Sequence, residues 1–146
     1  MFTIIVYLRS VNSERNMKKW FVFLVLTLFI CSSCKESKKE RFQRVAKEYS
    51  KRCPVRVDEN TRMDSMLYIP EQNINRYYYT LMGVSASQDS INKKRKTIEE
   101  NLIFAVKNSI GLKEYKDYNT IIEYVFYSEK DSSELLKISV TPNRYK

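Results

Sequence analysis

The sequence contains no histidine, and it has only two glycines, three prolines and three cysteines. Without histidine, neither a Ser-His-Asp triad nor a Cys-His pair can be assembled, and the commonest metal-ligating side chain is missing. Two glycines are too few for the glycine-rich loops that bind phosphates or dinucleotides. These absences exclude several large classes of enzyme, so the sequence predicts no catalytic residue, no metal site and no cofactor.

A long hydrophobic run lies near the N-terminus, at residues 20–30, and only Thr27 interrupts it. Lys18 and Lys19 precede the run and small residues follow it. A positive start, an apolar run of this length and a small-residue exit are typical of a secretory signal peptide. The run is too short for a transmembrane helix, which needs ~20 apolar residues to cross ~30 Å of hydrocarbon.

The run is followed by Ile30-Cys31-Ser32-Ser33-Cys34, which resembles a bacterial lipobox. In lipobox proteins a diacylglycerol is attached to the cysteine thiol, and a signal peptidase cuts just before that cysteine. The resemblance implies that Cys34 carries fatty acyl chains, among them palmitate, and that membrane lipid is a partner. It also implies a cell-envelope location, with the outer membrane favoured over the inner. Cys31 stands where lipobox proteins usually have leucine. Cys31 is also a poorer candidate for acylation than Cys34, because bulky Ile30 precedes it where a small residue is expected.

The signal peptide defines how the chain is divided. We interpret Met17 as the true start, because a signal peptide normally begins at its own methionine and two lysines follow Met17 directly. Residues 1–33 are then a removed signal peptide, with residues 1–16 upstream of the true start. Residues 34–39 are a charged tether, and residues 40–146 form a single domain.

The domain shows periodicities of both helix and strand. A helix is predicted from Glu40 to just before Pro54, and a long helix over residues 90–109. Alternating or β-branched and aromatic runs predict four strands, at residues 62–69, 75–82, 120–128 and 134–141. The expected fold class is α+β: an N-terminal helix, then ββαββ. Its four antiparallel strands form one sheet, and the long helix packs on one face.

Three segments of the domain also carry a family resemblance. They are Cys53-Pro54-Val55-Arg56-Val57-Asp58-Glu59 with the residues that follow it, Tyr77-Tyr78-Tyr79-Thr80-Leu81, and Ile138-Ser139-Val140-Thr141-Pro142. These segments are similar to a group of small bacterial envelope lipoproteins with a Cys-Pro-x-x-Val-Asp-Glu opening. The resemblance implies export and a small α+β domain, and it carries over no catalytic residue.

Tyrosines on the predicted strands are the feature that favours binding. An open sheet face would display several of them, and exposed aromatic patches often mark recognition sites. The alternative is that tyrosine is simply a good, half-buried strand former. The possible binding face consists of Tyr68, Tyr77, Tyr78, Tyr79, Tyr124 and Tyr127.

Other polar and reactive residues have ordinary explanations. The run Lys93–Lys96 covers more than one helical turn and predicts a solvated face, so no nucleic-acid partner is expected. Asp58 and Glu59 point opposite ways in an extended chain and predict turn chemistry. Cys53 has no neighbouring base and predicts an inert thiol.

The sequence therefore predicts a non-enzymatic, membrane-anchored envelope lipoprotein that binds or scaffolds a partner, such as an envelope protein or glycan. One alternative is a carboxylate-dependent enzyme, or enzyme subunit, acting on glycans. It would require two acidic groups facing one cleft, roughly 5–9.5 Å apart. Another is an inhibitor module that offers a sheet edge or face to an enzyme.

Overall fold

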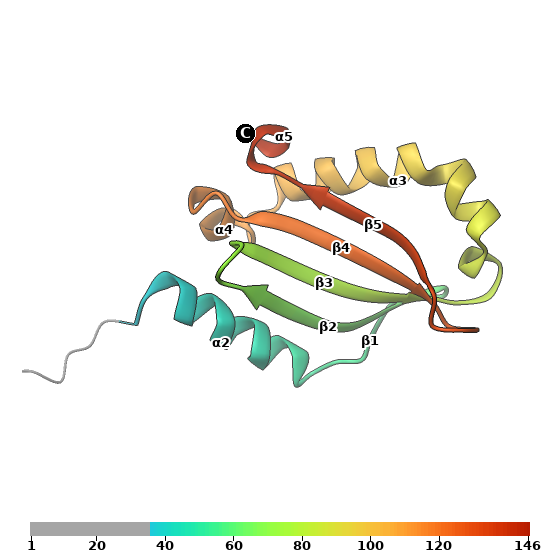
Figure 1. Cartoon of the computed structure of the whole chain (residues 1–146), viewed down its shortest axis with the longest axis horizontal. Helices are drawn as coiled ribbons and strands as arrows, with labels where there is room; N and C mark the ends of the chain where they lie inside the picture. The colour runs from blue at the N-terminus through green and yellow to red at the C-terminus, as the bar shows by residue number, and fades with distance from the viewer. Residues whose placement is uncertain (1–35) are drawn as a thin grey trace, which may run out of the picture. The chain divides into compact units, whose positions relative to one another are not determined.

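The computed structural model describes residues 36–146, which form a five-stranded sheet flanked by helices (Figure 1). The elements in chain order are α2 (Lys38–Ser50), β1 (Val55–Asp58), β2 (Thr61–Ile69), β3 (Ile74–Leu81), the 3-10 helix η1 (Gly83–Ala86), α3 (Gln88–Asn108), α4 (Lys113–Asp117), β4 (Ile121–Ser128), β5 (Glu134–Val140) and α5 (Pro142–Tyr145). None of the helices within residues 36–146 is long and apolar enough to cross a membrane.

The strands lie in the order β1-β2-β3-β4-β5, and every neighbouring pair is antiparallel except β3 and β4. The prediction of an α+β fold and of the β2–β3 and β4–β5 hairpins is confirmed. The prediction of four wholly antiparallel strands is wrong. Because α3 carries the chain back from the end of β3 to the start of β4, these two strands run the same way. The extra strand, β1, has only four residues, and all are exposed.

A bulge in β2 decides which side chains of that strand are buried. Met63 pairs with Tyr79 and Ser65 pairs with Tyr78, so Asp64 is an extra residue between them. Strict alternation along the strand would place Met63 and Met66 on opposite faces. The extra residue brings Met63 and Met66 to the same face, and both are buried.

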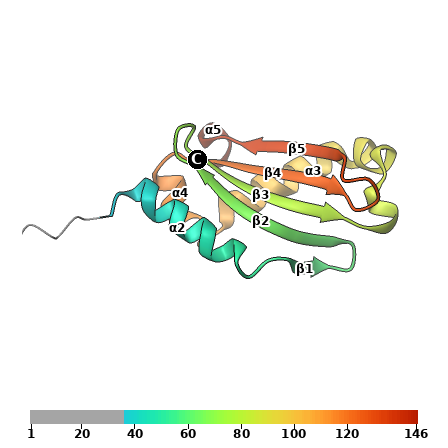
Figure 2. The ribbon, with the colours of Figure 1, turned by 60° about the horizontal axis from the view of Figure 1, so that its bottom comes forward.

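Helix α2 lies along β2 at the edge of the sheet (Figure 2). It begins at Lys38, two residues before the predicted start, because Ser37 and Glu40 form a capping box. At the other end, the Ser50 hydroxyl accepts a hydrogen bond from the Met66 N–H at 2.9 Å and donates to the Met66 carbonyl at 2.7 Å. These bonds satisfy backbone groups that would otherwise be free on β2.

The hydrophobic core lies between the sheet and the helices. Its buried side chains are spread along the chain from residue 42 to residue 145. Phe42 of α2 stacks on Tyr115 of α4 with ring centroids 4.2 Å apart and meets Tyr68 edge-on at 5.2 Å. Residues 37–146 form a compact unit with this core of their own. The core therefore supports independent folding of a fragment that starts at residue 36.

The C-terminus adds to this core. The strand ending before Pro142 was predicted, but Pro142 also begins the single turn α5. Tyr145 of that turn is buried, and its hydroxyl donates to the Thr120 carbonyl at 2.9 Å. The last residues are thus part of the packed domain.

Candidate functional site

The sheet has two faces of different chemistry. The covered face is the side on which the core packs, and Ile122, Phe126, Ile138 and Val140 point to it. The open face carries the alternate residues, including Arg76 and Glu123, which pair across β3 and β4. Because side chains alternate along a strand, each strand contributes to both faces.

A groove on the covered face lies between α3 and the sheet. Its volume is about 230 Å³, and it is lined by Thr61, Leu81, Ser90, Ile91, Lys94, Ile98, Phe126 and Leu136. We call this cavity the α3 groove. Most of its lining is apolar, and Lys94 is the one charged residue in that lining. An apolar slot with a cation on its wall fits an apolar side chain next to a carboxylate.

A row of stacked aromatic rings continues from the groove along the covered face. Phe126, which lines the groove, stacks on Tyr79 at 5.3 Å, and Tyr124 stacks on Tyr79 at 6.3 Å and on Tyr77 at 5.5 Å. Burial raises the pKa of Tyr79 to about 12 and also raises the pKa of Tyr77 and Tyr124. At physiological pH these phenols are therefore neutral, and the row offers aromatic surface and hydroxyl groups without charge.

Two buried polar atoms lie at the far end of this row. Asn75 is fully buried and donates from Nδ2 to the Tyr77 hydroxyl at 3.0 Å, but its Oδ1 has no hydrogen-bond partner. The Tyr115 hydroxyl likewise has none, and burial raises its pKa to about 12. An unmet buried hydrogen-bonding group costs about 1–3 kcal/mol. This end of the row is thus polar but incompletely paired.

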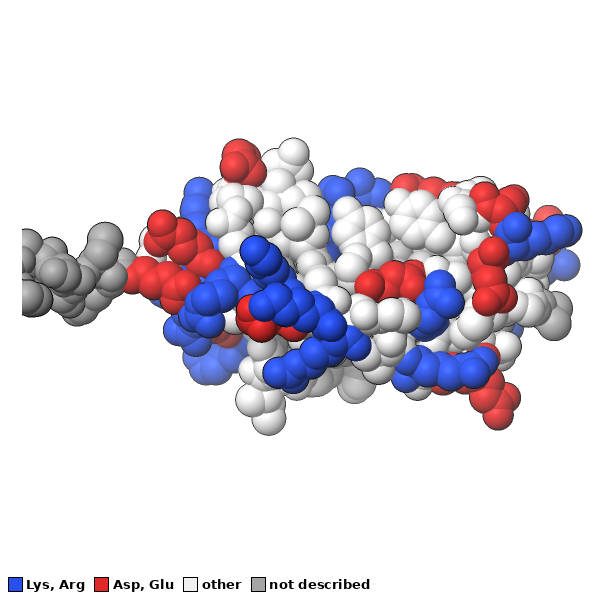
Figure 3. Space-filling view, turned by 90° about the horizontal axis from the view of Figure 1, so that it is seen from below, with Lys and Arg blue, Asp and Glu red and all other residues white. Residues whose placement is uncertain are grey.

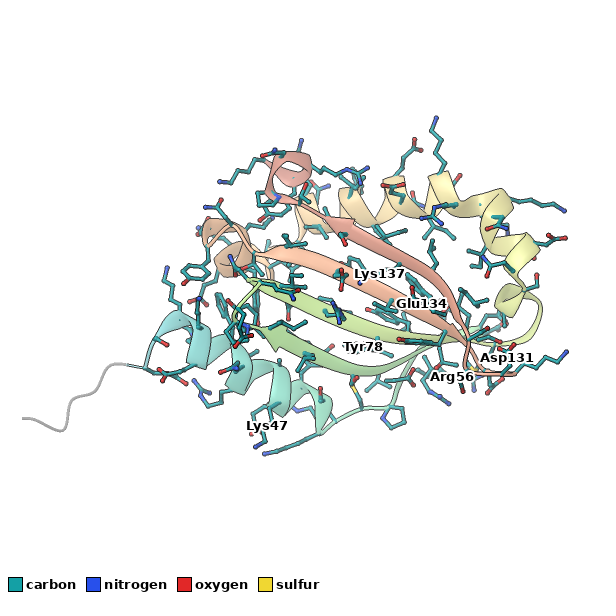
Figure 4. All side chains as sticks on the ribbon, viewed as in Figure 1. Lys47, Arg56, Tyr78, Asp131, Glu134 and Lys137 are labelled. Atoms are coloured by element: carbon teal, nitrogen blue, oxygen red, sulfur yellow. The ribbon has the colours of Figure 1, made fainter. Side chains whose placement is uncertain are left out.

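The open face carries a network of ion pairs. Glu123, almost fully buried, pairs with Arg76 and lies 3.4 Å from the Lys137 ammonium, and Ser139 donates to it at 3.0 Å. In Figure 4, Lys137 stands on the sheet between α2 and α3. The network neutralises a carboxylate that water cannot reach directly.

Asp64, another carboxylate of the open face, is also paired. Asp64 pairs with Arg62 at 2.7 Å and accepts a hydrogen bond from Thr80 at 2.6 Å. The α3 groove contains no carboxylate, and a shallow cavity of about 620 Å³ beside η1 contains one, Glu129. The acidic pair that a glycan hydrolase needs is therefore not found in either of these two cavities.

The structure separates the six predicted binding tyrosines. Tyr68 is buried in the core, and Tyr77, Tyr79 and Tyr124 lie on the covered face. Tyr78 and Tyr127 lie on the open face, where their rings stack at 6.4 Å. The six side chains do not form one surface, because consecutive residues of β3 point to opposite sides.

The remaining sequence features keep local roles. Lys93–Lys96 is exposed along α3, as predicted for a solvated helix face. Asp58 accepts a hydrogen bond from the Asn60 N–H at 2.8 Å, which is turn chemistry. Cys53 is half-buried, and burial raises the pKa of its thiol. Within residues 36–146, no group of three Cys, Asp or Glu could hold a metal ion. Cys34, the predicted lipidation site, lies outside the described residues.

The α3 groove could not have been found from the sequence. Its lining comes from β2, β3, α3, β4 and β5, so no local pattern contains it. The one local signal is the helical spacing of Ile91 and Ile98, which predicts a stripe packed against the sheet. The structure leaves Ile98 half-buried, and that partial exposure opens the groove.

A mixed sheet with a helical crossover and an apolar groove defines a small α+β domain. The chain belongs to the family described as "Domain of unknown function (DUF8479)", whose model matches residues 37–136. The match runs from the start of α2 to the first residues of β5. A comparison with curated proteins found no match.

Two solved structures share the fold. One is a Pseudomonas aeruginosa protein described as secreted, with a TM-score of 0.65 and 16% identity over 79% of this chain and 99% of that chain. The other is a pilotin from the Vibrio vulnificus type 2 secretion system, with a TM-score of 0.57 and 9% identity over 74% of this chain and 91% of that chain. At these identities the likeness shows the fold alone.

Proposed function

We propose that this protein is a lipid-anchored envelope protein whose domain binds a protein partner through the α3 groove. The anchor is Cys34, acylated after the signal peptide is removed, and the binding role involves no covalent chemistry. The observation that carries the binding role is the groove itself, with its apolar lining and Lys94 on its wall. The shared fold with a secreted protein and a pilotin supports an envelope setting.

The groove favours a peptide segment that places an apolar side chain beside an acidic one. Ile98, Phe126 and Leu136 supply apolar contact area, which is worth about 25 cal/mol per Å² removed from water. Lys94 is exposed, so it is able to pair with a carboxylate at the rim. Such rim pairs add specificity and association rate more than affinity.

The state of the open-face carboxylates supports a non-enzymatic role. A general acid or base needs a proton-transfer group free to meet a substrate. Asp64 and Glu123 are both held by arginines, and Glu123 also by Lys137 and Ser139. Both carboxylates therefore stabilise the sheet and are not free to act as the acid and base of a glycan hydrolase.

The anchor is tested by palmitate labelling in the native host. Wild-type protein should incorporate the label, and Cys34→Ala should lose it, because Cys34 supplies the acceptor thiol. Cys31→Ala is the matched control and should keep the label. Label retained in Cys34→Ala would reject the acyl site, whatever the groove binds.

The groove is tested by site-specific photo-cross-linking in living cells. A photoreactive amino acid at Lys94, on the groove wall, should give a discrete protein adduct. The same amino acid at Lys96, exposed two residues further along α3, should not. Mass spectrometry should place the adduct on a segment with neighbouring apolar and acidic residues. Equal adducts at both positions, or none at Lys94, would refute the binding role of the groove.

A further inference from the structure

The corner where α3 meets α4 exposes the two most accessible large hydrophobic side chains of the described domain. Phe104, in the last turns of α3, is 71% exposed, and Ile110, in the connection to α4, is 89% exposed. Single exposed hydrophobic residues are common on soluble proteins, but two of this size only six residues apart in the chain require an explanation. We call the segment 104–117 the α3–α4 corner.

Lysines lie close in sequence to these two side chains. Lys107 and Lys113 are exposed, and the Lys116 ammonium donates to the Lys107 carbonyl at 2.7 Å, which joins α4 to the end of α3. Lys113 pairs with Asp117 at 2.7 Å, but the Lys113 side chain remains 74% exposed. Residues 38–41 and 104–117 together contain six basic and three acidic side chains. Large apolar groups next to lysines are typical of segments that lie in a membrane interface.

The corner is packed directly against the start of α2. Arg41 pairs with Glu114 at 2.9 Å, and the Lys38 ammonium lies 5.6 Å from the centre of the Tyr118 ring. Figure 1 shows the start of α2, α4 and the end of α3 at the same end of the molecule, and Figure 3 shows further Lys and Arg side chains gathered over α2. Acidic side chains also lie at this end in Figure 3, but the basic ones are in excess.

The tether limits how far this end can be from the bilayer. The chain from Cys34 to Lys38 is four residues long, and an extended chain spans at most about 3.5 Å per residue. An acylated Cys34 at the membrane surface therefore holds the start of α2 within about 14 Å of it. Because Arg41 of α2 pairs with Glu114 of α4, the α3–α4 corner lies at the end of the domain that this tether holds near the bilayer.

We infer that the α3–α4 corner is a membrane-contact surface for the bilayer to which the protein is anchored. Phe104 and Ile110 enter the boundary between headgroups and acyl chains, and Lys107 and Lys113 bind anionic headgroups. This inference rests on the anchor of the proposed function. It orients the domain with the start of α2 toward the lipid and the opposite end of the sheet, including the α3 groove, toward solvent.

Vesicle binding of residues 36–146 tests the surface without the anchor, since this fragment contains the complete core. We expect it to sediment with vesicles of phosphatidylcholine and phosphatidylglycerol, and binding to weaken with added salt. Phe104→Ser with Ile110→Ser should lower the bound fraction at least fivefold. The matched control, Val55→Ser with Val57→Ser, changes two exposed apolar residues of β1 and should leave binding within twofold.

A second pair of variants tests the charges. Lys107→Gln with Lys113→Gln should weaken binding to the anionic vesicles several-fold. Lys93→Gln with Lys96→Gln removes the same charge from the other half of α3 and should change it by less than twofold. Equal losses in both pairs would show attraction by net charge alone and would overturn the inference.

Two further readouts separate the remaining outcomes. Circular dichroism should give each variant the melting temperature of the parent within a few degrees, so that a loss of binding reports the surface. If Phe104 and Ile110 instead mediate dimerisation in sedimentation velocity, the corner is a contact between copies and the inference fails. If the fragment does not bind vesicles while palmitate labelling of Cys34 succeeds, the anchor stands and the membrane-contact surface is refuted.

Discussion

The two faces of the sheet are built from the same strands but differ in their chemistry. On the covered face, Tyr77, Tyr79 and Tyr124 stack beneath the helices as neutral rings. On the open face, the alternate positions of β3 and β4 hold Arg76 and Glu123, which pair with each other. Residue type alone therefore does not reveal the role of a strand residue here, since adjacent tyrosines of β3 lie in opposite environments.

The comparison also separates two sources of stability. The covered face is stabilised by removing apolar area from water, which is non-directional and large. The open face is stabilised by an ion-pair network, whose Coulomb gain is offset by the cost of desolvating the charges. We therefore expect substitutions on the two faces to differ in magnitude and in salt dependence.

The largest effect is expected from truncating an apolar residue of the covered face. Ile122 is fully buried, so Ile122→Ala should lower the free energy of unfolding by about 3 kcal/mol through lost contacts and a new cavity. Leu67→Ala, at a position on the open side that is 47% exposed, should cost less than about 1 kcal/mol. Urea unfolding of the 36–146 fragment measures both. Similar losses of unfolding free energy in the two variants would show that the open side of β2 excludes water as well as the core does.

An intermediate effect is expected from opening the network on the open face. Glu123→Ala should lower the free energy of unfolding by about 2 kcal/mol, because Arg76 and Lys137 lose their counter-charge. The value is below that of a fully buried pair because Lys137 is 44% exposed. Glu134→Ala, an exposed carboxylate on β5, is the control and should stay within about 0.5 kcal/mol. A Glu123→Ala protein as stable as wild type would show that the network does not contribute to stability.

The smallest effect concerns two buried hydroxyl groups and differs in sign. The Tyr145 hydroxyl donates to the Thr120 carbonyl, so Tyr145→Phe should destabilise the fold by about 1 kcal/mol. The Tyr115 hydroxyl has no partner, so Tyr115→Phe should be neutral or stabilising by up to about 1 kcal/mol. Thermal unfolding followed by calorimetry resolves the two. Destabilisation by Tyr115→Phe would point to an internal water or ligand that bonds this hydroxyl.

Much of the fold could be predicted from local patterns. Apolar alternation in Leu136, Ile138 and Val140 identified β5, and all three are buried as expected. The aromatic run at 75–82 and the helical spacing from Ile91 to Val106 identified β3 and α3. These signals succeed because each element buries one stripe or face, which leaves a period in the sequence.

Other features of the fold leave no periodic pattern in the sequence. Strand β1 has four exposed residues, and the inserted Asp64 shifts the alternation of β2 by one. The parallel pairing of β3 with β4 follows from the helical crossover between them, which leaves no local pattern in either strand. The α3 groove needs side chains from five elements, so it exists only once they are packed.

By itself, the sequence determined the longer helices and strands, because burial of one face imposes a period on neighbouring residues. It also predicts a leader and acylation at Cys34, since both predictions rest on short contiguous signals. Only the tertiary structure decided which tyrosines share a face, which carboxylates are paired, and that α4 packs against the start of α2. Those relations join residues far apart in the chain, and distance in space is not encoded by spacing in sequence.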